Sequence, residues 1–61
     1  MSFRKSRLLA GKTVVEVKEA LNVSSSTVWL WEKGKNLPRA DKLLQIAELY
    51  GCTVDDLLKD D

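Results

Sequence analysis

Apolar residues recur at three- and four-residue intervals along this 61-residue chain, but residues that end helices interrupt the pattern four times. These intervals are typical of amphipathic helices, and no segment alternates apolar and polar residues as a half-buried strand does. Glycine and asparagine end helices because they adopt the left-handed conformation readily. The four interrupting residues are Gly11, Asn22, Gly34 and Gly51. The sequence therefore predicts an all-α fold, a compact bundle of five short helices over residues 3–10, 14–21, 25–33, 40–50 and 54–59.

Capping residues at the helix starts support these boundaries. Thr13 and Glu16 have the spacing of a capping box, in which each side chain accepts a hydrogen bond from the other residue's backbone amide. Thr53 and Asp56 repeat this spacing with aspartate in place of glutamate. Ser24 is a favourable N-cap for the third helix. We therefore expect the second, third and fifth helices to begin directly after these three caps.

The third helix divides its apolar residues between two faces. Val28 and Trp31 lie three residues apart and share a face, so both are expected in the core. Trp29 lies about 200° round the helix from Trp31, so the two tryptophans cannot both be buried. The other residues expected in the core are Val14, Val17, Leu21, Leu43, Leu44, Ile46, Ala47 and either Leu49 or Tyr50.

The size and composition of the chain argue against an enzyme. We expect one domain over residues 1–61, and a domain this small has little room for a substrate cleft. Histidine is absent and Cys52 is the single cysteine, so the commonest general base and any cysteine pair are missing. We expect no catalytic residue, no metal and no cofactor. No long apolar segment predicts a membrane span or a signal peptide, so we expect a cytoplasmic protein.

The charge of the chain is unevenly distributed. Residues 1–42 contain nine Lys or Arg and four Asp or Glu, a net charge of +5. Residues 43–61 contain one Lys and five Asp or Glu, a net charge of −4. Such an asymmetry is expected where one end of a molecule faces a polyanion such as nucleic acid, and equally where the charge is ordinary solvated surface.

The second and third predicted helices are separated by only three residues, 22–24. A turn this short makes two helices cross steeply, which is the helix-turn-helix arrangement. In DNA-binding proteins the crossing exposes the N-terminal half of the second of these helices, which enters a major groove. Because many helical hairpins with short turns bind nothing, the turn alone predicts the arrangement and not its function.

Residues 21–34, with the sequence LNVSSSTVWLWEKG, are similar to the pattern L-G-V-S-x-x-T-V-S-x-W-E-x-G. This is the pattern of Cro/C1-type (XRE) helix-turn-helix domains of phage repressors and bacterial regulators. The resemblance extends through residues 37–44 and 47–58, and the last block resembles phage-associated regulators. It implies a lambda-repressor-like five-helix fold and a transcriptional regulator that binds double-stranded DNA in a sequence-specific manner. A phage or mobile-element repressor, bound to a palindromic operator as a weak homodimer, is the expected form.

The resemblance and the helical spacing together imply a set of DNA contacts. Serine hydroxyls bond to several base edges and apolar side chains contact thymine methyl groups. The residues expected at the bases are Ser25, Ser26, Trp29 and Leu30. The residues expected at the phosphates are Ser24, Thr27, Lys33, Lys35, Asn36 and Arg39. An exposed Trp–Leu pair also marks protein interfaces, so an antitoxin-like or anti-repressor interaction module is the alternative function.

Arg7 and Glu32 occupy positions that resemble those of an ion pair between the first and third helices of the family. We expect them to meet, partly buried, in a structural role. A surface pair between Glu32 and Lys35 is the alternative. Two residues depart from the family pattern: Val14 replaces a glutamine that contacts DNA, and Lys18 replaces a small alanine. The resemblance therefore implies the fold more firmly than the details of docking.

Overall fold

The computed structural model describes residues 2–59, in which five helices follow one another without a strand. They are α1 (Phe3–Leu9), α2 (Val14–Leu21), α3 (Ser25–Lys33), α4 (Ala40–Tyr50) and α5 (Val54–Leu58). The predicted all-α, five-helix fold is confirmed. Residues 1, 60 and 61 of the predicted domain lie outside the described residues. No helix within residues 2–59 is long and apolar enough to cross a membrane.

Two helices end one residue earlier than the sequence predicts. α1 ends at Leu9 because Gly11 turns left-handed, with a φ of 70°, two residues later. α5 ends at Leu58 because Lys59 is extended, with φ −78° and ψ 137°. Both differences concern the last residue of a helix, where the backbone leaves the helical conformation.

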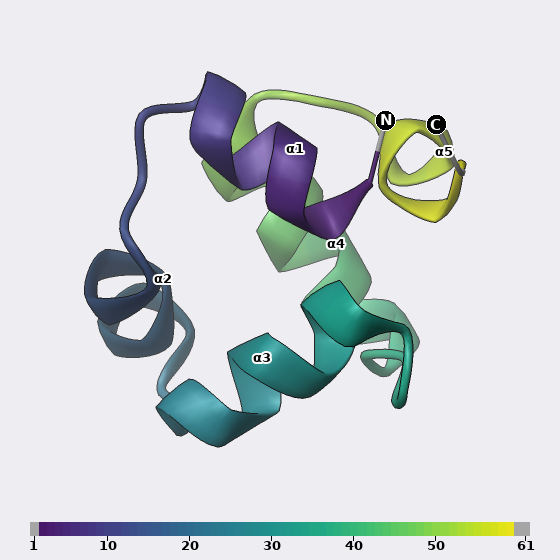
Figure 1. Cartoon of the computed structure of the whole chain (residues 1–61). Helices are drawn as coiled ribbons and strands as arrows, with labels where there is room; N and C mark the ends of the chain where they lie inside the picture. Colours follow the sequence, from purple (N-terminus) through teal and green to yellow (C-terminus); the bar gives the residue numbers. More distant parts are fainter. Residues whose placement is uncertain (1, 60–61) are drawn as a thin grey trace.

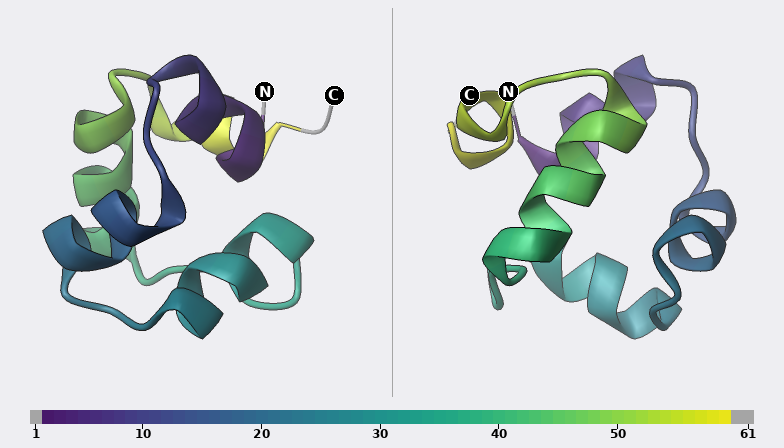
Figure 2. Two further views of the ribbon diagram at one scale, coloured as in Figure 1. Left: turned by 60° about the vertical axis from the view of Figure 1, so that its left-hand side comes forward. Right: turned by 180° about the vertical axis from the view of Figure 1, so that it is seen from behind.

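α3 lies along one outer edge of the molecule. α1 and α5 lie at the opposite end, and α4 runs from the side of α3 toward them (Figure 1). Two further views keep α3 at the same edge (Figure 2). α3 packs against α2 and α1, whereas α4 packs against α1, α2 and α5. α3 therefore rests on its neighbours along one side only, which leaves its other side to solvent.

The core is shared among all five helices. Val17 of α2, Val28 of α3 and Ile46 of α4 are fully buried, and together they join the helix-turn-helix pair to the rest of the molecule. The remaining buried apolar residues are Phe3, Leu21, Trp31, Ala47, Tyr50 and Leu57. Because helices of five to eleven residues are marginal by themselves in water, each helix here depends on this shared burial.

The expectation that Leu44 lies in the core is wrong, because its side chain is 65% exposed. The buried stripe of α4 contains Ile46, Ala47 and Tyr50, which follow the spacing of one helical face. Leu44 lies about 200° round the helix from the fully buried Ile46 and so faces solvent. Of the two alternatives left open by the sequence, Tyr50 is buried and Leu49 is half-buried.

The corner between α2 and α3 is held from both sides. Asn22 adopts the left-handed conformation with a φ of 56°, and the amide of Val23 donates to the carbonyl of Lys18 at 3.0 Å. From α4, the ammonium group of Lys42 donates to the carbonyl of Leu21 at 2.6 Å. A cation at this position also compensates the negative end of the α2 dipole. These contacts fix the direction in which the chain enters α3.

Ser6 provides a test of the packing around α1. Its side chain is buried and its hydroxyl has no hydrogen-bond partner among the described residues. Because an unsatisfied buried hydroxyl costs about 1–3 kcal/mol, Ser6→Ala is expected to raise the free energy of unfolding by about 1 kcal/mol in urea denaturation. Ser2→Ala is the control and is expected to lower the free energy of unfolding, because the Ser2 hydroxyl caps α1 by accepting a hydrogen bond from the Lys5 amide. A loss of stability in Ser6→Ala would contradict this account.

Candidate nucleic-acid interface

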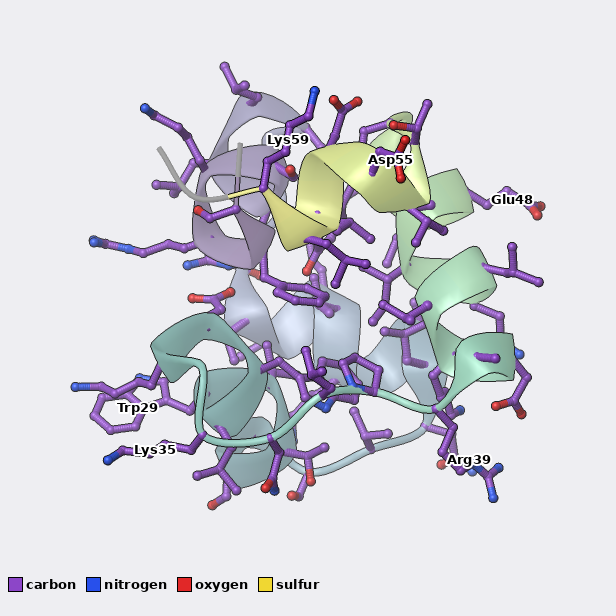
Figure 3. The ribbon with its side chains drawn as sticks, turned by 90° about the vertical axis from the view of Figure 1, so that its right-hand side faces the viewer. Trp29, Lys35, Arg39, Glu48, Asp55 and Lys59 are labelled. Carbon is purple, nitrogen blue, oxygen red and sulfur yellow. The ribbon has the colours of Figure 1, made fainter. Side chains whose placement is uncertain are left out.

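The exposed edge of α3 carries Ser25, Ser26 and Trp29. Trp29 follows the two serines by one helical turn and is 57% exposed, and its ring points away from the body of the molecule (Figure 3). On the opposite side of the helix Val28 is fully buried and Trp31 is 6% exposed. The helix therefore has a core face and a solvent face, as its spacing predicts.

Leu30 is not part of this exposed edge. Its place next to Trp29 in the sequence predicts an exposed apolar pair, but its side chain is half-buried. Leu30 precedes the buried Trp31 by one residue, about 100° round the helix, and therefore lies at the border between the two faces. Thr27, three residues earlier on the same side, is half-buried as well. The prediction of an exposed Trp–Leu pair is wrong for its leucine.

The start of α3 is rich in hydroxyl groups. The Ser24 hydroxyl accepts from the Thr27 amide at 3.2 Å and lies 2.9 Å from the Thr27 hydroxyl. No acidic residue occupies the first turn of α3. The first turn of α2, in contrast, contains Glu16, whose pKa is lowered by the hydrogen bond that it accepts from the Thr13 amide. The positive end of the α3 dipole, unlike that of α2, therefore has no carboxylate in its first turn.

The end of α3 carries cations. The ammonium group of Lys33 lies 4.3 Å from the centre of the Trp29 ring, a cation–π contact of about 0.5–1 kcal/mol at an exposed site. Lys35 and Asn36 follow in an exposed loop, and both of their amides bond to the Leu30 carbonyl, at 3.0 and 3.4 Å. The loop is therefore tied to the last turn of α3.

The charge asymmetry of the sequence is also an asymmetry in space. Lys35 and Arg39 lie at the edge of the molecule that α3 forms, whereas Glu48 and Asp55 lie toward the other end (Figure 3). Arg39 is exposed and its guanidinium lies 3.3 Å from Asp41, an exposed pair that contributes little to stability. A polyanion is therefore attracted to the α3 edge and repelled from the α4–α5 end.

The structure places Arg7 of α1 and Glu32 of α3 in contact. Arg7 Nε lies 2.6 Å from Glu32 Oε2 and its Nη2 lies 3.2 Å from Oε1. A third bond runs from Arg7 Nη1 to the Lys12 carbonyl, at 3.0 Å. The hydrogen bond to Glu32 raises the pKa of Arg7, and the two side chains are 11% and 8% exposed. Within residues 2–59, the Glu32 carboxylate is held by Arg7 and not by Lys35. The pair joins α1 to α3.

A half-open groove of about 540 Å³ lies between α1 and α3, next to Trp29. Arg4 of α1 and Val14 of α2 form part of its wall, together with Lys33 and the ion pair described above. The sequence alone predicts no role for Arg4, because no local spacing connects it with α3. Only the packing of α1 against α3 brings these side chains to one place.

The helix-turn-helix family model matches residues 3–57, nearly the whole chain. The chain belongs to the Cro/C1-type helix-turn-helix family. Its five helices fit the lambda-repressor-like fold of this family, and α2 and α3 form the helix-turn-helix. Comparisons with curated proteins and with solved structures found no significant match.

This helix-turn-helix domain is a binding protein for double-stranded DNA, of the XRE type of regulator. The family is not normally enzymatic. No group of three or more His, Cys, Asp or Glu side chains is placed to hold a metal ion in the part of the chain that the structure describes. The exposed features around α3 are its solvent-facing edge, the hydroxyl groups at its start and the cations at its end.

The ion pair can be tested by a double-mutant cycle. Arg7→Met is expected to lower the free energy of unfolding by about 3 kcal/mol, because it leaves the Glu32 carboxylate buried without its partner. The double variant Arg7→Met/Glu32→Leu is expected to be more stable than Arg7→Met, since it removes the stranded charge. Urea unfolding of the wild type, of the single variants Arg7→Met and Glu32→Leu, and of the double variant gives the coupling energy between the two side chains. Additive effects would show that the two residues do not interact.

The raised pKa of Tyr50 predicts that the domain loses stability at high pH. The pKa of Tyr50 is raised from 10.0 to about 12, first by burial of the phenol and then by the nearby Glu32 carboxylate. The folded state thus favours the protonated phenol, so this contribution to stability is complete below pH 10 and is lost as the pH rises to about 12. The free energy of unfolding should fall more steeply over this range in the wild type than in Tyr50→Phe. Equal slopes would contradict the prediction.

Proposed function

We propose that this domain is a sequence-specific repressor of phage or mobile-element origin that binds its operator by placing α3 in the major groove. The observation that carries the proposal is the exposed edge of Ser25, Ser26 and Trp29 on a helix whose other side is buried. A helix with a free polar edge at the rim of a domain fits a groove about 12 Å wide. The similarity of residues 47–58 to phage-associated regulators supports the origin.

In this proposal the bases are contacted mainly by Ser25, Ser26 and Trp29. The two hydroxyls donate to or accept from base edges, and the exposed tryptophan ring meets thymine methyl groups. Leu30 contributes only the part of its side chain that is exposed. Because α3 contains no arginine, bidentate contacts to guanine, each worth about 1–3 kcal/mol of discrimination, are missing from it. We therefore infer that discrimination among operators is modest.

The proposed phosphate contacts fall into two groups at the two ends of α3. One group is formed by the hydroxyls at the helix start and the other by polar and cationic side chains after its end. They are Ser24 and Thr27 in the first group and Lys33, Lys35 and Asn36 in the second, with Arg39 at the start of α4. Two groups of phosphate-binding side chains, one at each end of α3, fit the two DNA strands that border one major groove.

The operator is proposed to be a palindrome bound by two copies of the domain, because helix-turn-helix proteins match the symmetry of their sites. Pairing through α5 would be weak, since α5 has only five residues. Such a repressor acts where the DNA is, so the proposal includes a location in the cytoplasm. The alternative, a protein-interaction module built on Trp29 and Leu30, is less favoured because Leu30 is half-buried.

Mobility-shift titrations over a range of salt concentrations test the proposal, with duplexes selected from a random pool. The wild type is expected to show a log–log salt slope of several units, at about 0.9 for each phosphate contact. Trp29→Ala is expected to lose affinity with an unchanged melting temperature, because the ring is 57% exposed. Leu44→Ala is the matched control: it removes a similarly exposed apolar side chain from α4 and should bind as the wild type does.

The absence of salt-sensitive binding to every duplex would overturn the proposal. Loss of a protein partner in Trp29→Ala, with DNA binding retained, would favour the interaction module instead. The length and symmetry of the selected sites also report how many copies of the domain bind.

A further inference from the structure

The groove between α1 and α3 contains more cations than its ion pair, Arg7–Glu32, can neutralise. Its wall includes two arginines, one lysine and one glutamate: Arg4, Arg7, Lys33 and Glu32. Arg7 and Glu32 compensate each other through two hydrogen bonds and are nearly buried. Within the described part of the chain, Arg4 and Lys33 have no ion-pair partner, and both are exposed. The groove therefore presents two uncompensated cations to whatever enters it.

One of these cations is held in place by a neighbour. The Lys33 ammonium lies 4.3 Å from the centre of the Trp29 ring, one helical turn earlier on α3. This contact restricts a long side chain that would otherwise sample many rotamers, so less entropy is lost when Lys33 binds an anion. Trp29 thus serves as a wall between the exposed serine edge of α3 and the groove.

The distance along α3 between Ser25 and Lys33 indicates where the groove would lie on a bound duplex. Lys33 follows Ser25 by eight residues, which is about 12 Å along a helix axis. The major groove of B-form DNA is about 12 Å wide. When Ser25 and Ser26 face the base edges, Lys33 and the groove beside it lie at the border of the major groove, where the phosphates are.

We propose that this groove is a DNA-backbone site that holds one phosphodiester group of the bordering strand between the Arg4 guanidinium and the Lys33 ammonium. Trp29 separates this phosphate from the bases. The proposal rests on the proposed function and deepens it, because it assigns a contact to α1, a helix outside the helix-turn-helix. A phosphodiester is favoured over a protein segment because the two uncompensated groups of the wall, Arg4 and Lys33, are both cations.

The experiment compares Arg4→Gln, Lys33→Gln and the double variant with the wild type on one selected duplex. Each lost contact should reduce the log–log salt slope by about 0.9, which corresponds to about an eightfold loss of affinity at 0.1 M salt relative to 1 M salt. The loss should be the same on unrelated duplexes, because phosphates carry no sequence. Lys59→Gln is the control: it removes an exposed cation that does not line the groove of Arg4 and Lys33, and it should leave the slope unchanged.

Ethylation of individual phosphates gives a second readout. One flanking phosphate should interfere with binding of the wild type when ethylated, and the same modification should have no effect on Arg4→Gln. Arg4→Gln is expected to melt at the wild-type temperature, because the side chain is exposed, and Lys33→Gln about a few degrees lower, because it loses the cation–π contact with Trp29.

The outcomes separate the two proposals. If the wild type binds no duplex, the proposed function fails. If the wild type binds and Arg4→Gln keeps the full salt slope, the proposed function survives and the backbone site is overturned. Binding of a poly-glutamate peptide that is lost in the double variant, with DNA binding unchanged, would assign the groove to an acidic protein segment and overturn the backbone site as well.

Discussion

Burial of Val28 and Trp31 determines which side of α3 turns inward, and the other functional features of the domain depend on this orientation. Once these two side chains enter the core, Ser25, Ser26 and Trp29 are directed to solvent by helical geometry alone. Contacts at both ends then hold the helix in place. The α2–α3 corner, bonded to α4 from Lys42, secures its start, and the Arg7–Glu32 pair secures its last turn to α1. Contacts within the domain therefore set the orientation of the exposed edge.

Electrostatics adds direction to this geometry. Arg4 lines the groove beside Trp29 and Arg39 lies at the edge that α3 forms, while Glu48 and Asp55 lie toward the other end of the molecule. The net charge of the chain is only +1. The electrostatic field of the domain therefore results from the separation of positive and negative side chains more than from an excess of positive charge. In the proposed complex the domain approaches DNA with the α3 edge first. Discrimination among bases then depends on few side chains, because α3 contains no arginine.

Much of this arrangement was predictable because the relevant signals are local. The left-handed residues and capping boxes lie within a few residues of the boundaries that they set, and the spacing of Val28 and Trp31 separates them from Trp29. The errors occurred where a helix has more apolar residues than its buried stripe accommodates. Leu44 and Leu30 are apolar, but one faces solvent and the other lies at a border, and only the neighbouring helices decide which leucines they cover.

The sequence by itself determined five helices, the steep corner after α2 and the identity of the exposed edge, because hydrogen bonds within a helix and the conformations of its end residues depend on nearby residues. Tertiary structure alone decided how α1 lies against α3. That packing brings Arg4 to Lys33 and creates the groove beside Trp29. No periodicity connects residues of different helices, since their relative placement results from the sum of many weak apolar contacts in the shared core.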